Sequence, residues 1–457
     1  MAEKKFYIAT FGCQMNDRDS EIMHQLLNES DYAATADMEN ADLVVVNTCS
    51  VREKAEQKAY SLLGSLKKLK RRNPDLIVAV TGCVAQQDGE NLLKRIPHAD
   101  LILGPQKIYD LPQLVKTVEK QHAPQTATEL NSAFVIPPFL PDVESGSQFK
   151  RFVTIMQGCN NFCTYCVVPF TRGREISRAF DDIIGEVSHL ASRGIKEVTL
   201  LGQNVNSYGL DSKDKCAACA SGEKTCRSTT NADFPALLKA VAQIPGIERL
   251  RFTSSHPKDL SVRLMKCFAE IDNLCPHFHL PFQSGSDRIL KLMNRRYTAA
   301  DYLEKVRQLR EIRPDIVLTT DIIVGFPGET DEDFEATMYL LEEVRYHSAF
   351  SFQYSDRPYA KSADFPDKVA PEVKSARLAR LQKRQSEITL ARNLEYIGQT
   401  MPVMVEGQGK ADNQWSGRTV TNHIVNFTGG SALQPGQTVE VEIEEGLLHS
   451  LRGRLVG

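Results

Sequence analysis

Short apolar runs alternate with amphipathic segments along the first part of the chain. The runs FYIAT, DLVVV, LIVAV and ADLILG are each followed by a segment with helical spacing of its apolar residues, as in VREKAEQKAYSLLGSLKKL. Strands that are apolar throughout and separated by helices are typical of a parallel sheet covered on both faces. The pattern therefore predicts an N-terminal parallel α/β sandwich over residues 1–122.

The same alternation returns after a proline-rich stretch, residues 123–147, that we interpret as a linker. Strands are predicted near RFVTIMQ, EVTLLGQ, ERLRFTS, HFHLPFQ, VLTTDIIVGF and AFSFQYS, with amphipathic segments between them. These units predict an incomplete version of the (β/α)8 barrel, a (β/α)6 barrel, over residues 148–385. Polar, glycine-rich loops follow the strands, at the end where such barrels keep their chemistry.

The pattern changes again near the C-terminus. A long basic helix is predicted from Pro371 to Gly398, and short alternating strands follow it in MPVMVEG, SGRTVTN, HIVNFTG, QTVEVEIEE and LRGRLVG. Short strands with glycine-rich turns favour a small closed β-barrel, because closure removes exposed strand edges. We assign this third domain to residues 386–457.

Composition and charge exclude several classes of protein. The net charge of −3 gives no whole-molecule attraction to nucleic acid, so any such surface must be a local patch. No apolar run approaches the roughly 18 residues of a membrane span, and the N-terminus lacks the pattern of a signal peptide. The 11 cysteines, an odd number, suit a reducing compartment. We expect a cytoplasmic monomer without a membrane partner.

Three cysteines in the N-terminal domain occupy equivalent positions. Cys13, Cys49 and Cys83 each follow a predicted strand, at the sheet edge where α/β proteins bind ligands. A single cysteine there is most often a small buried hydrophobe. Three in the same position, two of them preceded by glycine, favour a shared metal site.

A second set of cysteines follows the first strand of the predicted barrel. Cys159, Cys163 and Cys166 have the spacing C-x3-C-x2-C in the stretch MQGCNNFCTYCVVPFTRG. Zinc is the alternative metal, but zinc sites usually pair two such motifs or add a nearby pair of histidines. Iron–sulfur clusters are held by cysteine thiolates, normally four. Three cysteines leave one iron of a 4Fe–4S cluster open to a small molecule.

This motif, with Tyr165 before the third cysteine, is similar to the signature of the radical S-adenosylmethionine superfamily. The resemblance implies that the open iron binds S-adenosylmethionine and that an electron from the cluster cleaves it to a 5′-deoxyadenosyl radical. The motifs TFGCQMNDRDSE, NTCSVREKAEQK and TGCVAQ ahead of such a barrel resemble the methylthiotransferases, most closely those that form 2-methylthio-N6-dimethylallyladenosine in tRNA. That resemblance implies a second 4Fe–4S cluster on Cys13, Cys49 and Cys83, which takes part in sulfur delivery.

The implied reaction agrees with the implied cofactors. The C2–H bond of adenine is not acidic, so a positioned base cannot remove that hydrogen usefully, whereas a carbon radical supplied by a cofactor can abstract it. The resemblance implies insertion of a methylthio group at C2 of N6-dimethylallyladenosine beside the anticodon. The implied partners are a tRNA anticodon stem-loop, an electron donor and a sulfur source.

The resemblance also assigns residues to the cofactor and to RNA. Those implied to hold S-adenosylmethionine are Tyr165, Gln203, Gln283, Ser284, Asp321 and Val324. Arg172, Arg174 and Arg178 follow the second cysteine set, where the sulfur-bearing ligand or an RNA phosphate is their expected partner and a surface ion pair is the alternative. The C-terminal barrel is similar to a TRAM domain, an RNA-binding module in which Asn413, Trp415 and Arg418 offer stacking and phosphate contacts.

One region departs from the family pattern. Residues 209–234 interrupt the second barrel unit with small polar residues and with Cys216, Cys219 and Cys226. We interpret them as a surface insertion, with a further metal site as the alternative. Cys267 and Cys275 are predicted core residues. The alternative functions are methylthiolation of threonylcarbamoyladenosine or of a ribosomal protein, and a non-catalytic iron–sulfur protein that binds RNA.

Overall fold

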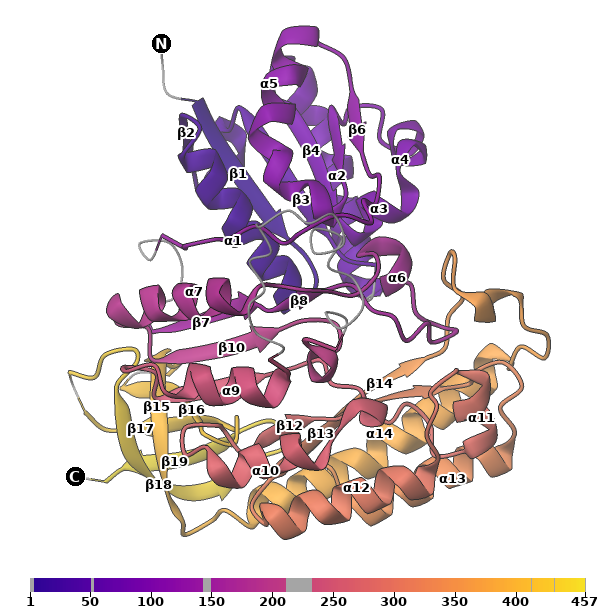
Figure 1. Ribbon diagram of the computed structural model, residues 1–457, viewed down its shortest axis with the longest axis vertical. Helices are drawn as coiled ribbons and strands as arrows, with labels where there is room; N and C mark the ends of the chain where they lie inside the picture. The colour runs from indigo at the N-terminus through magenta and orange to yellow at the C-terminus, as the bar shows by residue number, and fades with distance from the viewer. Residues whose placement is uncertain are drawn as a thin grey trace, which may run out of the picture.

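The computed structural model describes residues 4–50, 53–142, 149–210, 232–411, 413–430 and 432–456. The chain forms an N-terminal α/β domain, a central half-barrel and a small C-terminal barrel (Figure 1). Cys216, Cys219 and Cys226 lie outside the described residues. Within the described ranges no helix has the length and apolar character needed to span a membrane.

The N-terminal domain is a six-stranded parallel sheet in the order β2-β1-β3-β4-β5-β6. Its elements are β1 (Lys4–Thr10), α1 (Gln14–Asn28), β2 (Tyr32–Ala34), η1 (Met38–Asn40), β3 (Leu43–Thr48), α2 (Glu53–Arg72), β4 (Ile77–Gly82), α3 (Cys83–Asp88), α4 (Glu90–Arg95), β5 (Leu101–Leu103), η2 (Pro105–Asp110), α5 (Leu111–Gln121) and β6 (Gln125–Ala127). The predicted parallel α/β sandwich is thereby confirmed.

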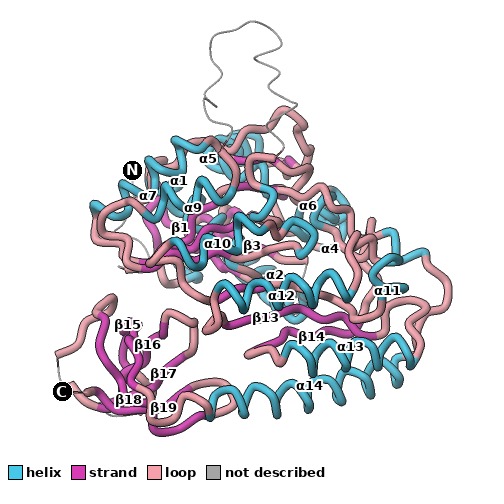
Figure 2. Tube along the Cα trace, turned by 60° about the horizontal axis from the view of Figure 1, so that its bottom comes forward, coloured by secondary structure: helices cyan, strands magenta, loops and turns pink. Residues whose placement is uncertain are grey.

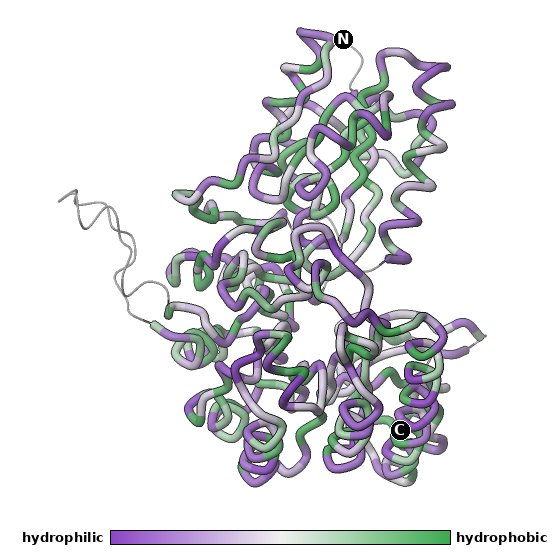
Figure 3. The backbone as a smooth tube through the Cα atoms, turned by 90° about the vertical axis from the view of Figure 1, so that its right-hand side faces the viewer, coloured by the Kyte–Doolittle hydropathy of each residue, from purple (hydrophilic) through white to green (hydrophobic). Residues whose placement is uncertain are grey.

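Alternate residues of each central strand pack on opposite faces of this sheet. Val45 of β3 packs in the core formed with α1 and α5, whereas Val44 and Val46 pack in the core formed with α2 and α4. All residues of β3 and β4 are buried, which explains why these strands are apolar at every position before their last residues. In Figure 3 hydrophobic colour follows the strands, and the outer turns of the helices are hydrophilic.

The central domain is an open barrel of parallel strands. Two three-stranded sheets, β11-β10-β7 and β12-β13-β14, are joined where the Leu250 N–H donates to Asn273 O and the Cys275 N–H donates to Leu250 O. The elements are β7 (Lys150–Thr154), β8 (Met156–Gln157), α6 (Val168–Thr171), β9 (Ile176–Ser177), α7 (Phe180–Ser192), β10 (Glu197–Leu201), η3 (Val205–Ser207), α9 (Phe234–Ala242), β11 (Arg249–Phe252), η5 (Pro257–Asp259), α10 (Val262–Glu270), β12 (His277–His279), α11 (Asp287–Leu292), α12 (Ala299–Ile312), β13 (Val317–Val324), α13 (Asp331–Val344), β14 (Ser348–Gln353), η6 (Lys361–Asp364) and α14 (Pro371–Leu394). This confirms the predicted incomplete barrel.

The C-terminal domain is a closed barrel in the order β15-β16-β17-β19-β18, with β15 also paired to β18. Its strands are β15 (Thr400–Gln408), β16 (Gln414–Thr419), β17 (Ile424–Thr428), β18 (Thr438–Gly446) and β19 (Leu451–Leu455). Figure 2 shows this barrel at the end of α14. Arg249 and Arg251 of β11 donate hydrogen bonds to backbone carbonyls at the end of β16, which attaches it to the half-barrel.

Two domain boundaries differ from the prediction. Gln125–Ala127, expected in the linker, pairs with β5 as the edge strand of the N-terminal sheet. The boundary predicted at residue 386 falls inside α14, because Ile388 still packs in the half-barrel core. The C-terminal barrel therefore begins after Leu394, the last residue of that helix.

A buried group of charges fastens the N-terminal domain to the half-barrel. Arg18 of α1 and Arg178, which follows β9, both form ion pairs with Glu186 of α7. All three side chains are at most 1% exposed. Removing one partner of a buried ion pair is costly because the remaining charge is left uncompensated.

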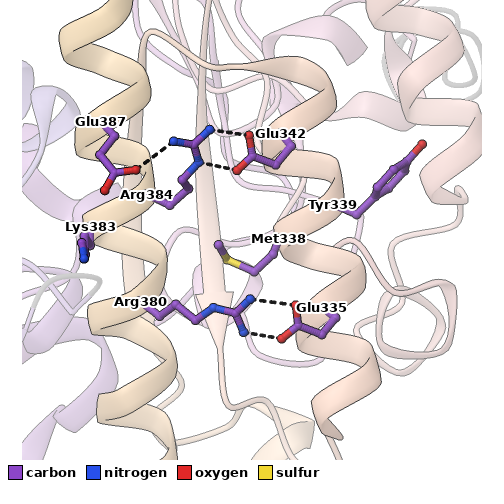
Figure 4. Close-up of a pocket in the computed structure, with 8 residues that line it drawn as sticks. All are labelled: Glu335, Met338, Tyr339, Glu342, Arg380, Lys383, Arg384 and Glu387. Carbon is purple, nitrogen blue, oxygen red and sulfur yellow. Dashed lines mark hydrogen bonds and ion pairs between the residues drawn. The ribbon is translucent and has the colours of Figure 1, made fainter.

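We therefore expect Glu186→Gln to lower the free energy of unfolding by about 3–5 kcal/mol. The matched control is Glu342→Gln, which removes one exposed carboxylate that pairs with Arg384 between α13 and α14 (Figure 4). An exposed pair contributes about 1 kcal/mol at most. The shift of the urea unfolding midpoint measures both, and equal shifts would contradict the assigned role of Glu186.

Candidate functional site

The three N-terminal cysteines converge at one edge of the sheet. Cys13 follows β1, Cys49 follows β3 and Cys83 begins α3 directly after β4, and these strands are neighbours in the sheet. Cys13 is hydrogen-bonded to Cys49 and is electrostatically coupled to Cys83. The structure thus brings together three residues that are widely separated in the sequence.

Two glycines permit this close approach. Gly12 has φ +137°, and a Cβ atom at this position would lie 2.4 Å from Cys49 Cβ. Gly82 has φ +94°, and its added Cβ would lie 2.2 Å from Thr48 O. Such conformations and contacts exclude any larger residue. The glycine before Cys13 and before Cys83 therefore serves the convergence of the cysteines.

The N-terminal cysteine thiols differ in their electrostatic environment, and their pKa values shift in opposite directions. The hydrogen bond with Cys49 lowers the pKa of Cys13 to about 6, and the nearby Arg172 guanidinium acts in the same direction. Burial raises the pKa of Cys83, against the opposing effect of Arg172. A metal displaces the protons of such thiols when it binds.

The second set, Cys159, Cys163 and Cys166, lies on the loop between β8 and α6. The Cys166 N–H donates to Cys163 O at 2.9 Å, which folds this end of the loop into a turn. The loop begins at Gly158, with φ +80°, where an added Cβ would lie 2.0 Å from Arg174 O. Burial raises the pKa of Cys159 to about 11 and that of Cys166 to about 12.

Arg295, which the sequence analysis did not single out, contacts this second set. Its Nη1 lies 3.5 Å from Cys163 Sγ and 3.4 Å from the hydroxyl oxygen of Tyr165. Its Nη2 donates to Pro281 O at 2.8 Å, and the side chain is buried. The guanidinium therefore places a positive charge directly beside one cysteine of this set.

The side chains of Gln203 and Asp321, both predicted to hold the cofactor, have polar partners in the structure. Gln203 Oε1 accepts a hydrogen bond from the Gly158 N–H, so that this side chain supports the loop that carries the cysteines. Asp321 Oδ2 lies 3.4 Å from His279 Nε2 on the neighbouring strand β12. Gln203 follows the carboxyl end of β10, where the fold predicts functional groups, whereas Asp321 lies within β13.

Gln283, Ser284 and Val324 were also predicted to hold the cofactor, and they lie at or beside the ends of barrel strands. Gln283 adopts a left-handed backbone, φ +67°, and pairs with Ile322 through an isolated bridge. Ser284 is fully buried, with its hydroxyl 3.4 Å from that of Thr337. The Val324 side chain packs in the outer core of the half-barrel, so only its backbone is available to a ligand inside.

The edge strand β14 carries two exposed aromatic rings that the sequence analysis also missed. Phe350 and Phe352 are 52% and 42% exposed. Ser351 and Gln353 form hydrogen bonds with side chains of α14, on the outer face. Because successive side chains of a strand point to opposite faces, Phe350 and Phe352 point to the inside of the half-barrel.

These rings stand beside the candidate cofactor residues. Phe350 is in register with Asp321, and Phe352 with Ile323, so the four side chains share the inner face of β13 and β14. Ile323 and Tyr165 pack against the same buried group. The inner face of β13 is therefore packed close to Tyr165, the residue that precedes Cys166.

The three arginines after Cys166 have different environments. Arg178 is buried in the ion pair with Glu186 and so has a structural role. Arg174 is exposed, with its guanidinium 4.3 Å from the centroid of the Phe162 ring. Arg172 is buried beside the N-terminal cysteines.

The residues predicted to contact RNA differ in accessibility. Trp415 is 9% exposed in the core of the C-terminal barrel, and its Nε1 donates to Gly430 O. Its burial favours a structural role over base stacking. Arg418 is half-buried and pairs with Glu406 at 3.2 Å, whereas Asn413 is exposed on a turn with φ +56°.

Both cysteine sets offer the donor atoms that an iron–sulfur cluster takes. A cluster spreads its thiolate ligands over several irons, and each set offers three thiols, with Gly12 and Gly82 beside the first set and Gly158 beside the second. The donor set and its cradle thus suit a 4Fe–4S cluster with one iron open.

Comparisons with known proteins agree with the division of the chain into three domains. Residues 5–104 match the Uncharacterized protein family UPF0004, residues 153–341 the Radical SAM superfamily and residues 394–456 the TRAM domain. A tRNA-2-methylthio-N(6)-dimethylallyladenosine synthase of Desulfotalea psychrophila is 52% identical over the whole of both chains. One of Syntrophobacter fumaroxidans is 50% identical over 100% of this chain and 96% of its own. This chain belongs to that family of synthases.

Membership in the synthase family confirms the predicted resemblance and implies a 4Fe–4S cluster and S-adenosylmethionine as cofactors. Solved structures support the fold. The radical S-adenosylmethionine methyltransferase TsrM from Kitasatospora setae has a TM-score of 0.54 at 14% identity, covering 79% of this chain and 77% of its own. The cobalamin-dependent radical enzyme OxsB has a TM-score of 0.52 at 12% identity, covering 85% and 62%.

Proposed function

We propose that this synthase inserts a methylthio group at C2 of N6-dimethylallyladenosine beside the anticodon of tRNA. The observation that carries the proposal is the pair of three-cysteine sites, one on the N-terminal sheet and one on the half-barrel, in a chain that matches named synthases along its whole length. The substrate in the relatives' name is a prenylated adenosine of tRNA. The tRNA, an electron donor and a sulfur source are the partners, and the cytoplasm is the compartment.

The two cysteine sites would serve different steps of the reaction. Cys159, Cys163 and Cys166 would hold the cluster that, with S-adenosylmethionine, supplies a carbon radical able to abstract hydrogen from an unactivated carbon. Cys13, Cys49 and Cys83 would hold the second cluster, from which sulfur is delivered. The short helices α3 and α6, one beside each site, pack against each other (Figure 1).

The residues on the inner face of the half-barrel would orient the substrates and exclude water. Gln203 supports the cysteine loop, and Asp321 offers a carboxylate to a polar group of the cofactor. Phe350 and Phe352 offer aromatic faces to a flat base that carries an apolar prenyl group. An adenosine that enters through the open edge of the barrel would meet these rings first.

We expect Phe352→Ala to raise the KM for prenylated tRNA about tenfold, because stacking of a base on an aromatic ring is worth roughly 1–3 kcal/mol. Cleavage of S-adenosylmethionine without tRNA should be unchanged, since the substitution leaves the cysteine loop intact. The control is Tyr339→Ala, which removes a 60% exposed ring on α13, and it should leave the KM unchanged. An unaltered KM in Phe352→Ala would remove this residue from the substrate site.

A comparison of tRNA nucleosides from cells with and without the gene tests the function itself. We expect the 2-methylthio form of N6-dimethylallyladenosine to disappear without the gene and the unthiolated nucleoside to accumulate. Loss of a methylthio group from threonylcarbamoyladenosine, or from a ribosomal protein, would contradict the proposed substrate.

A further inference from the structure

Arg295 is a buried cation that lacks a carboxylate partner. Eight arginines among the described residues are buried. Seven of them form an ion pair with an aspartate or a glutamate: Arg18, Arg151, Arg172, Arg178, Arg249, Arg251 and Arg377. Arg295 is 4% exposed and, within the described ranges, has no such ion pair. Because a buried charge without an opposite charge is costly, this guanidinium calls for an anion beside it.

The hydrogen bonds of Arg295 direct its guanidinium at the second cysteine set. Nη2 donates to Pro281 O at 2.8 Å, and Nε donates to the Tyr297 hydroxyl at 3.1 Å. Nη1 lies 3.5 Å from Cys163 Sγ and 3.4 Å from the Tyr165 hydroxyl. Of these four partners, only the cysteine becomes anionic when a metal binds.

The turn that carries this arginine is itself attached to the cysteine loop. Asn294 Nδ2 donates to Asn161 O at 3.0 Å, on one side of Cys163. On the other side, the Thr164 N–H donates to Met293 O at 3.1 Å. Backbone contacts on both sides of the cysteine therefore fix the position of the guanidinium relative to its sulfur.

We propose that Arg295 is the counter-charge of the iron–sulfur cluster on the second cysteine set and stabilises the reduced form of that cluster. The inference rests on the proposed site of the cluster, Cys159, Cys163 and Cys166. Uptake of one electron adds one negative charge, and a cationic hydrogen-bond donor at a ligating sulfur favours the more negative state. The external reductant loses that electron, and Arg295 keeps its proton in both states. Arg295 acts through Cys163 and is a positioning residue.

The test measures the reduction potential of this cluster alone. The background is the full chain with Cys13, Cys49 and Cys83 replaced by alanine, so that the N-terminal cluster is absent. Iron per chain is counted first, and the electron paramagnetic resonance signal of the reduced cluster is then followed against the applied potential. The variants are Arg295→Gln, which removes the charge, and Arg295→Lys, which keeps it without the planar fork. Arg296→Gln, at an exposed arginine next in the chain, is the matched control.

We expect about four irons per chain in the background and in all three variants. The midpoint potential should fall by about 59 mV or more in Arg295→Gln, which corresponds to a tenfold change in a one-electron equilibrium. The loss of a charge-assisted hydrogen bond is enough for a change of this size. The fall should be smaller in Arg295→Lys, and Arg296→Gln should match the background because solvent and salt screen an exposed charge.

A second measurement needs no substitution at Arg295. The background chain is produced with arginine that carries the heavier stable nitrogen isotope in its guanidinium, and pulsed electron paramagnetic resonance records the nuclei coupled to the reduced cluster. Because Nη1 of Arg295 lies 3.5 Å from Cys163 Sγ, we expect a coupling to the labelled nitrogen.

Two results would overturn the inference and leave the proposed function standing. One is an unchanged midpoint potential in Arg295→Gln with the iron retained. The other is the absence of the nitrogen coupling, which also decides the question if Arg295→Gln loses its iron. Loss of all iron from the background chain would instead show that Cys159, Cys163 and Cys166 hold no cluster, and would contradict the proposed function itself.

Discussion

Replacement of Cys159, Cys163 and Cys166 by alanine is expected to abolish reductive cleavage of S-adenosylmethionine. These thiols are the three that lie together on the loop between β8 and α6, and the radical chemistry needs the cluster that they hold. Formation of 5′-deoxyadenosine after reduction with dithionite measures the loss. Iron should fall from about eight to about four per chain, since the N-terminal site is built on a separate sheet.

The matched control for this variant is Cys267→Ala. Cys267 is a fully buried cysteine that lies on α10 and packs in the half-barrel core. Its replacement should keep the iron content and the cleavage. Persistent 5′-deoxyadenosine formation in the triple variant would show that another group holds the cluster.

Replacement of Cys13, Cys49 and Cys83 by alanine should separate the two halves of the reaction. Cleavage of S-adenosylmethionine should continue, because the loop of the half-barrel keeps its three cysteines. Formation of the methylthio nucleoside should fall below detection, because the site of sulfur delivery is lost. Both products can be measured in one reaction mixture by liquid chromatography with mass spectrometry.

Two outcomes would contradict the assignment of the N-terminal site. Methylthio product from the Cys13, Cys49 and Cys83 variant would mean that sulfur reaches the tRNA by another route. Loss of 5′-deoxyadenosine formation would mean that this site serves radical generation as well. Iron content again separates a chemical effect from a failure to assemble the second cluster.

Much of the fold follows from local patterns in the sequence. The fully buried strands β3 and β4 are apolar at every position before their last residues, and a parallel sheet with two covered faces is the arrangement that uses such strands. The topology then brings Cys13, Cys49 and Cys83 to one edge, because parallel strands end together. The convergence of Cys13, Cys49 and Cys83 was therefore predictable.

Residues that act through tertiary contacts were not predictable in the same way. Arg295 reaches Cys163 from a distant part of the chain, and its neighbourhood carries no motif. Phe350 and Phe352 have the composition of an ordinary strand, and their exposure depends on β14 being the open edge of the barrel. In each case the decisive information is which surface a side chain meets.

For two residues the side-chain type suggested an accessibility that the fold does not give them. Trp415 is suited to base stacking by its chemistry, yet a five-stranded barrel needs large apolar side chains to fill its interior, and the ring lies there. Arg178 is suited to a phosphate, yet it compensates Glu186 inside a domain interface. Side-chain chemistry alone does not distinguish such structural roles from binding.

The most direct test of the central claim is the product formed by the purified, reconstituted chain. The reaction contains dithionite, S-adenosylmethionine, a sulfur source and a tRNA that carries N6-dimethylallyladenosine, and the nucleosides are identified by mass spectrometry after digestion. We expect conversion of that nucleoside to its 2-methylthio derivative together with formation of 5′-deoxyadenosine. Formation of 5′-deoxyadenosine with every tRNA nucleoside unchanged would contradict it.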